Sequence, residues 1–190
     1  MRATHPTLVA ASRAIAEHRD AMARQWTEWL GERIGTTPTV PREVVESEFA
    51  LLLDVFAALV GPLRRDARLI WKKAAEHYGR HATARGLAAG EVVEELQYLR
   101  ELLIRHLAPA IAALRPRQGM GLLLRLNRLV DKGIAMAVVG YTDSMVATLL
   151  PRESGDGGPE AANGDEIQAQ IEAIRAELTH LLAAPAAGAA

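Results

Sequence analysis

Apolar residues recur every three to four positions along most of the chain, which is the spacing that places them on one face of an α-helix. Glycine and proline interrupt the pattern at intervals and mark where helices end. The pattern predicts about five helices, over residues 6–34, 41–61, 63–85, 91–109 with a further turn over 110–114, and 120–150. The fold class is therefore all-α, as a globin-like or antiparallel helical bundle, with the helix over 120–150 as its spine.

Details of this pattern predict which side chains face the core and how helices end. In the helix over 63–85 we expect Leu69, Ile70, Ala74 and Tyr78 to face inward, and Gly86 to close the helix in the left-handed conformation. Pro109 lacks a backbone N–H, so it should bend or end its helix.

A polar stretch rich in glycine and proline, residues 151–164, predicts a flexible linker after a body spanning 6–150. A short amphipathic helix follows over 165–183, and we expect residues 184–190 to be disordered. The seam of this helix has the alternating three- and four-residue spacing of a coiled coil: Ile167, Ile171, Ile174, Leu178 and Leu181. Such a short helix needs a partner, either its own copy in a dimer or a groove on the body. We interpret it as a dimerisation or partner-docking element.

Charge and composition remove several classes of function. Lys and Arg number 22 against 23 Asp and Glu, which argues against nucleic acid as a partner. Cysteine is absent, so thiol nucleophiles and thiolate metal sites are excluded. The most apolar run carries too many charges to span a membrane, and no signal peptide is recognisable, so we expect a cytoplasmic protein.

His77 and His81 lie four residues apart and therefore share one face of a helix. That spacing supplies half of a metal or haem site, but the sequence does not indicate the other half. We interpret the pair as part of a solvated basic face and predict no metal. A metal site, as in a histidine- or carboxylate-based metalloenzyme, and an anion or ligand contact are the alternatives. A haem ligated by His77, His81 or His106 is a second alternative, which the shortage of aromatic residues disfavours.

Polar residues within the apolar stretch over 120–150 are the other candidates for ligand binding. Asn127, Asp131 and Tyr141 would need hydrogen-bond partners if they were buried. We expect a structural network with Arg100, and a ligand-lined cavity is the alternative. The basic residues Arg64, Arg65, Arg68, Lys72 and Lys73 are interpreted as a solubilising face.

Catalysis has no support in the sequence, because no nucleophile elbow, phosphate loop or paired-carboxylate motif is present. The group Glu91, Glu94 and Glu95 looks like the acidic first turn of a helix. We therefore predict no catalytic residues.

Several segments together resemble a known family. They are HYGRH at 77–81, RGL at 85–87, EVVEELQYLR at 91–100, LNRLVD at 126–131, YT at 141–142, and Trp26. In order and spacing they are similar to the N-terminal sensory domain of RsbRD-type sigma-factor co-antagonists, which also heads many bacterial sensor histidine kinases. The resemblance covers most of residues 8–150. One departure is Ala88 and Ala89, which stand where the family has a serine or threonine cap.

The resemblance implies a haem-free, globin-like input domain that dimerises and signals to an output domain. No output domain is recognisable in this sequence, so we expect action on a separate kinase, phosphatase or anti-sigma protein. The alternative is a small-molecule or haem-binding sensor.

Overall fold

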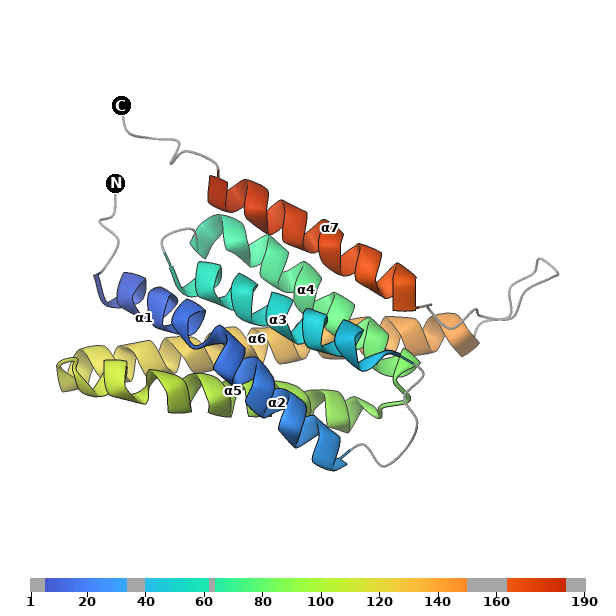
Figure 1. The fold of residues 1–190 in the computed structure, drawn as a ribbon, viewed down its shortest axis with the longest axis horizontal. Coiled ribbons are helices and arrows are strands. Elements are labelled where there is room, and N and C mark those ends of the chain that lie inside the picture. Colours follow the sequence, from blue (N-terminus) through green and yellow to red (C-terminus); the bar gives the residue numbers. More distant parts are fainter. Residues whose placement is uncertain (1–5, 34–39, 62–63, 150–163, 184–190) are drawn as a thin grey trace.

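The computed structural model describes residues 6–33, 40–61, 64–149 and 164–183. Over these residues the chain is helical and contains no strand, which confirms the all-α class (Figure 1). The helices are α1 (Pro6–Glu17), α2 (Arg19–Arg33), α3 (Arg42–Val60), α4 (Arg64–Ala84), α5 (Ala89–Ala112), α6 (Pro116–Leu149) and α7 (Gly164–Ala183). None of the described helices combines the length and apolarity that a membrane span requires.

The first predicted helix, 6–34, is wrong as a single element, because the chain bends at His18 between α1 and α2. The backbone hydrogen bonds continue across the bend, from His18 N to Ala14 O and from Met22 N to His18 O. The bend therefore costs few helical hydrogen bonds. Because of the bend, α1 and α2 both lie along α3. Three successive contacts tie them to it: Ser12 with Ala57, Arg19 with Asp54, and Trp26 with Phe49.

The other predicted helices are found, with changes at their ends. Pro109 lies inside α5, and the helix continues to Ala112. α6 begins at Pro116, four residues before its predicted start, because proline is well suited to the first helical position. Gly86 has φ +74°, and Leu87 N bonds back to Ala82 O, so the predicted left-handed cap of α4 is confirmed.

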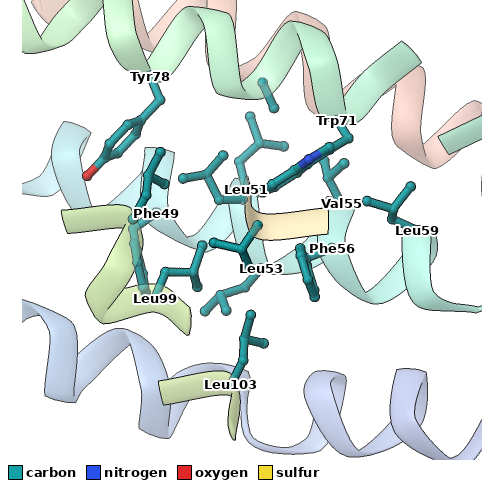
Figure 2. Close-up of a cluster of buried hydrophobic side chains, with 14 of the residues drawn as sticks. Phe49, Leu51, Leu53, Val55, Phe56, Leu59, Trp71, Tyr78, Leu99 and Leu103 are labelled. Carbon is teal, nitrogen blue, oxygen red and sulfur yellow. The ribbon is translucent and has the colours of Figure 1, made fainter. Parts of the chain in front are cut away.

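α3 is the most enclosed helix and supplies much of the core. Figure 2 shows its side chains meeting those of α4 and α5 in one apolar cluster. Phe56 packs edge-on against Trp71 with ring centroids 5.3 Å apart, and the Trp71 indole N–H donates to Leu129 O on α6. Leu69 is 70% exposed, so its predicted inward position is wrong. The predicted inward positions of Ile70, Ala74 and Tyr78 are confirmed, and the small residues Ala67, Ala75 and Ala82 are buried on α4 as well.

α4 and α6 approach each other so closely that their backbones touch. A Cβ added at Gly79 would lie 1.8 Å from Ala137 O, and one added at Gly140 would lie 2.0 Å from Glu76 O. Gly133 similarly leaves room for the Trp71 ring. The two backbones are therefore in direct contact at these glycines. Either helix can shift relative to the other only if this contact opens.

α7 packs on α3 and α4, on the side away from α5 and α6 (Figure 1). Ile167, Ile171, Ile174 and Leu178 are buried in the core, and Leu181 is partly buried. Lys73 pairs with Glu177 at 2.7 Å, and Arg175 donates to Ser47. The apolar seam therefore occupies a groove on the body of the same chain, and its interpretation as a dimer or partner surface is corrected. Of the predicted linker only Gly164 lies within the described residues, and the predicted disordered tail lies outside them.

Candidate functional site

Glu48, His77 and His81 meet between α3 and α4. The Glu48 Oε1 atom lies 2.8 Å from His77 Nδ1 and 3.1 Å from His81 Nδ1. The two imidazole rings are perpendicular, with centroids 3.7 Å apart. Their i,i+4 spacing on α4 places both rings on the face that packs against α3, where Glu48 points inward. We call these three residues the Glu-His-His cluster.

This cluster is closed off from solvent. The side chains of His77 and Glu48 are 2% and 3% exposed, and that of His81 is 6% exposed. Burial alone raises the pKa of Glu48, but hydrogen bonds from His77 and His81 outweigh it and lower that pKa to about 2. The carboxylate is therefore ionised. Burial lowers the pKa of His77, although Glu48 opposes the shift, and this favours a neutral imidazole.

Because a neutral imidazole carries one proton, His77 can donate to Glu48 only with that proton on Nδ1. His77 Nε2 is then a bare acceptor, and it is buried without a hydrogen-bond partner among the described residues. A buried polar atom without a partner costs about 1–3 kcal/mol. The cluster is thus incompletely satisfied as a hydrogen-bond network.

A second buried polar group joins α4 to α5. Arg85 donates two hydrogen bonds to Glu95, at 3.0 and 2.8 Å, and Tyr78 Oη donates to the same carboxylate at 2.5 Å. The guanidinium lies 5.0 Å from the centroid of the Tyr78 ring, within reach of a cation–π interaction. Burial and the charge of Glu95 raise the pKa of Tyr78 well above its ordinary value, so the phenol remains a donor. Burial acts to lower the pKa of Arg85, but Tyr78 and Glu95 outweigh it and raise that pKa above its ordinary value.

The structure corrects two predictions about these residues. His77 and His81 are buried, so the interpretation as a solvated basic face is wrong. Glu95 lies beyond the first turn of α5, where it is buried and pairs with Arg85, so it is not part of the acidic first turn. Glu91 does serve that turn: its carboxylate accepts the Ala88 backbone N–H at 2.7 Å. This contact partly replaces the cap expected to be lost with the alanines at 88 and 89.

The polar residues of α6 do not form a buried site. Asp131 pairs with Arg100 at the surface, with side chains 59% and 28% exposed, which confirms that contact but not a buried network. Asn127 and Tyr141 are half-buried. The four residues Arg100, Asn127, Asp131 and Tyr141 therefore do not converge on an enclosed cavity.

The remaining histidine and basic candidates lie elsewhere. His106, on α5, does not belong to the Glu-His-His cluster. Its ring centroid lies 5.2 Å from that of His18, and its Nε2 atom lies 3.2 Å from Gln25 Oε1. The basic residues 65, 68, 72 and 73 are exposed, and two of them pair with acid, Lys72 with Glu76 and Lys73 with Glu177.

Sequence reasoning missed Glu48, although a signal was present. Glu48 lies four residues after Val44 and four before Leu52, in the middle of the apolar stripe of α3. A carboxylate in such a position must be paired if the helix is buried. The same argument applies to Glu95, between Val92 and Leu99.

No family model, curated protein or solved structure matches this chain. The chemistry of the site therefore rests on its own geometry. A buried carboxylate flanked by two imidazoles can hold a proton or a small cation, and it fixes the position of α4 against α3.

Proposed function

We propose that the chain is a non-catalytic input module that regulates a bacterial stress-response or two-component pathway as a dimer. The observation that carries this proposal is that the ionisable side chains that meet inside the bundle are closed off from solvent. Each member of the Glu-His-His cluster is at most 6% exposed, and Tyr78 is fully buried. An organic substrate has no access to such groups, whereas a change in helix packing acts on them directly.

The helix contacts support a route for a signal through the bundle. α4 is linked by side-chain pairs to α3 through Glu48, to α5 through Glu95, which accepts from Tyr78, and to α7 through Glu177. Its backbone also touches α6 at two places. A displacement of α4 relative to α3 therefore has to move α6, which is 34 residues and about 51 Å long. In this proposal α6 transmits the change, through a shift between two packings of the bundle.

The dimer in this proposal uses α6, because the seam of α7 is occupied within the chain. Val139, Val146 and Leu149 are 43%, 47% and 75% exposed. Val139 and Val146 are seven residues apart and Leu149 is three further, so they share one side of the helix. Heptad spacing suits pairing with the same helix of a second copy, which presents an identical apolar row.

The resemblance to RsbRD-type sensory domains supplies the proposed pathway, and its partner would be a kinase, phosphatase or anti-sigma protein. The test is to delete the gene in its native host, measure transcripts under stress, and complement with wild type or with the α4–α6 contact variant Gly140→Leu. We expect the deletion to change stress-regulated transcripts, and only the wild type to restore them. Gly121→Leu, on an open part of the same helix, is the control and should also restore them. Unchanged transcripts in the deletion strain would contradict the proposal.

A further inference from the structure

We propose that Glu48, His77 and His81 bind a divalent first-row transition-metal ion, with zinc as the expected occupant, through one carboxylate oxygen and the two Nδ1 atoms. This site goes beyond the regulatory function proposed above and does not depend on it. It joins α3 to α4.

The spacing of the donor atoms fits one ion. One ligand atom from each residue lies within 4.8 Å of the other two, and the carboxylate oxygen is 2.8 and 3.1 Å from the two imidazole nitrogens. Ligands that bind zinc at about 2.0–2.2 Å lie roughly 3.0–3.5 Å apart at angles between 90° and 109°. The two carboxylate–imidazole separations therefore need to change by only a few tenths of an ångström, and the two imidazole donors lie within the 4.8 Å bound. A proton on a coordinating Nδ1 must move to Nε2 or leave as the ion binds.

The donor types select the class of metal. Two imidazoles and one carboxylate suit zinc and its neighbours in the first transition row, whereas calcium and magnesium prefer oxygen donors alone. Three protein ligands leave the fourth position of a tetrahedral zinc ion to a water molecule enclosed with it.

The buried charges supply an independent argument for a cation. Glu95 is neutralised by the two hydrogen bonds from Arg85, at 2.8 and 3.0 Å. Glu48 is equally buried, but its hydrogen-bond partners among the described residues are the His77 and His81 imidazoles, with no guanidinium bonded to it. A bound cation would place a formal positive charge directly against this buried carboxylate.

The geometry also sets the expected strength of binding. A metal-bound histidine usually donates its other ring N–H to an acceptor, and loss of that acceptor typically reduces metal affinity by about 10–100-fold. His77 Nε2 has no partner among the described residues. Binding should thus be weaker than in a closed structural zinc site and reversible by a chelator.

The experiment uses the full chain after chelator treatment, titrated with Zn²⁺ in competition with a chromophoric chelator and, separately, with Co²⁺ while its visible d–d bands are recorded. We expect one Zn²⁺ per chain and tetrahedral Co²⁺ bands. Glu48→Gln keeps the shape of the side chain and should weaken Zn²⁺ binding by at least about tenfold. His106→Ala and His180→Ala, which alter histidines outside the cluster, are the matched controls and should bind like the wild type.

Equal affinity of the wild type and Glu48→Gln would overturn the proposal, as would loss of binding in His106→Ala. If Glu48→Gln does not fold, ¹⁵N spectra of the wild-type imidazoles decide the question. Zn²⁺ should shift the Nδ1 resonances of two histidines. These two resonances should still be present in the spectra of His106→Ala and His180→Ala. Shifts confined to other histidines, or no shift, would also overturn it. Neither outcome bears on the transcript test of the regulatory function.

Discussion

Gly140 lies directly against the backbone carbonyl of Glu76: a Cβ at this position would be 2.0 Å from the carbonyl oxygen. The closest part of the α4–α6 interface is therefore a contact between two backbones, with no side chain that can move aside.

Gly140→Ala should consequently destabilise the protein, even though alanine is the better helix former. Overpacking of a tight interface costs about 1–3 kcal/mol, and here the helices themselves must separate. Urea unfolding would measure the loss. Gly121→Ala on the same helix meets no atom within 4 Å and should instead stabilise by about 0.5–1 kcal/mol. Equal effects of the two variants would contradict the close contact.

Glu95→Gln should be among the most destabilising substitutions in the chain. It leaves the Arg85 guanidinium, whose side chain is 3% exposed, without a buried counter-charge. Removing one partner of such a pair typically costs about 3–5 kcal/mol. Tyr78→Phe removes one hydrogen bond and leaves the ion pair intact, so about 1.5–3 kcal/mol is expected. Glu101→Gln on α5 breaks an exposed pair with Arg105 and should cost less than about 1 kcal/mol in the same unfolding assay.

Ile171→Asp should loosen α7 from the body rather than dissociate a dimer. Ile171 is fully buried, so the substitution places an unpaired carboxylate in the core, at a cost of about 3–5 kcal/mol. Hydrogen exchange should show loss of protection in α7. Leu182→Asp, at a side chain 56% exposed on the same helix, is the control and should leave the exchange unchanged. Unchanged stability together with a halved mass would restore the dimer seam to α7.

The double variant Val139→Asp/Val146→Asp should convert the proposed dimer to a monomer. Both side chains are exposed on one side of α6, so charge can be introduced there with little effect on the folded chain. Light scattering gives the mass. Leu69→Asp, at an exposed leucine on α4, should leave it unchanged. A wild-type protein that is already monomeric would refute this part of the proposal.

The sequence predicted the helices well, because periodic apolar faces and flanking Gly and Pro residues define them locally. The bend at His18 has no such signal: no breaker residue is present, and the hydrogen bonds continue across it. Leu69 was misplaced because the inward face of α4 also includes Ala67, Ala75 and Ala82, which a pattern of large apolar residues does not reveal.

The candidate site was predictable only in part. The i,i+4 spacing placed His77 and His81 on one face, but which helix that face meets depends on tertiary packing. Glu48 comes from a different helix, 29 residues away from His77, and local spacing cannot bring the two together. The seam of α7 raised the same difficulty, since its spacing indicated a need for a partner without saying which surface supplies it.

The backbone contact between α4 and α6 also indicates how distant relatives of this chain should be recognised. Only glycine fits at Gly79, Gly133 and Gly140 while the two helices stay at this separation, because a Cβ at any of the three would overlap a neighbouring atom. We expect homologues that share little else to keep small residues at this spacing. The spacing should therefore identify the fold more reliably than the buried polar residues do.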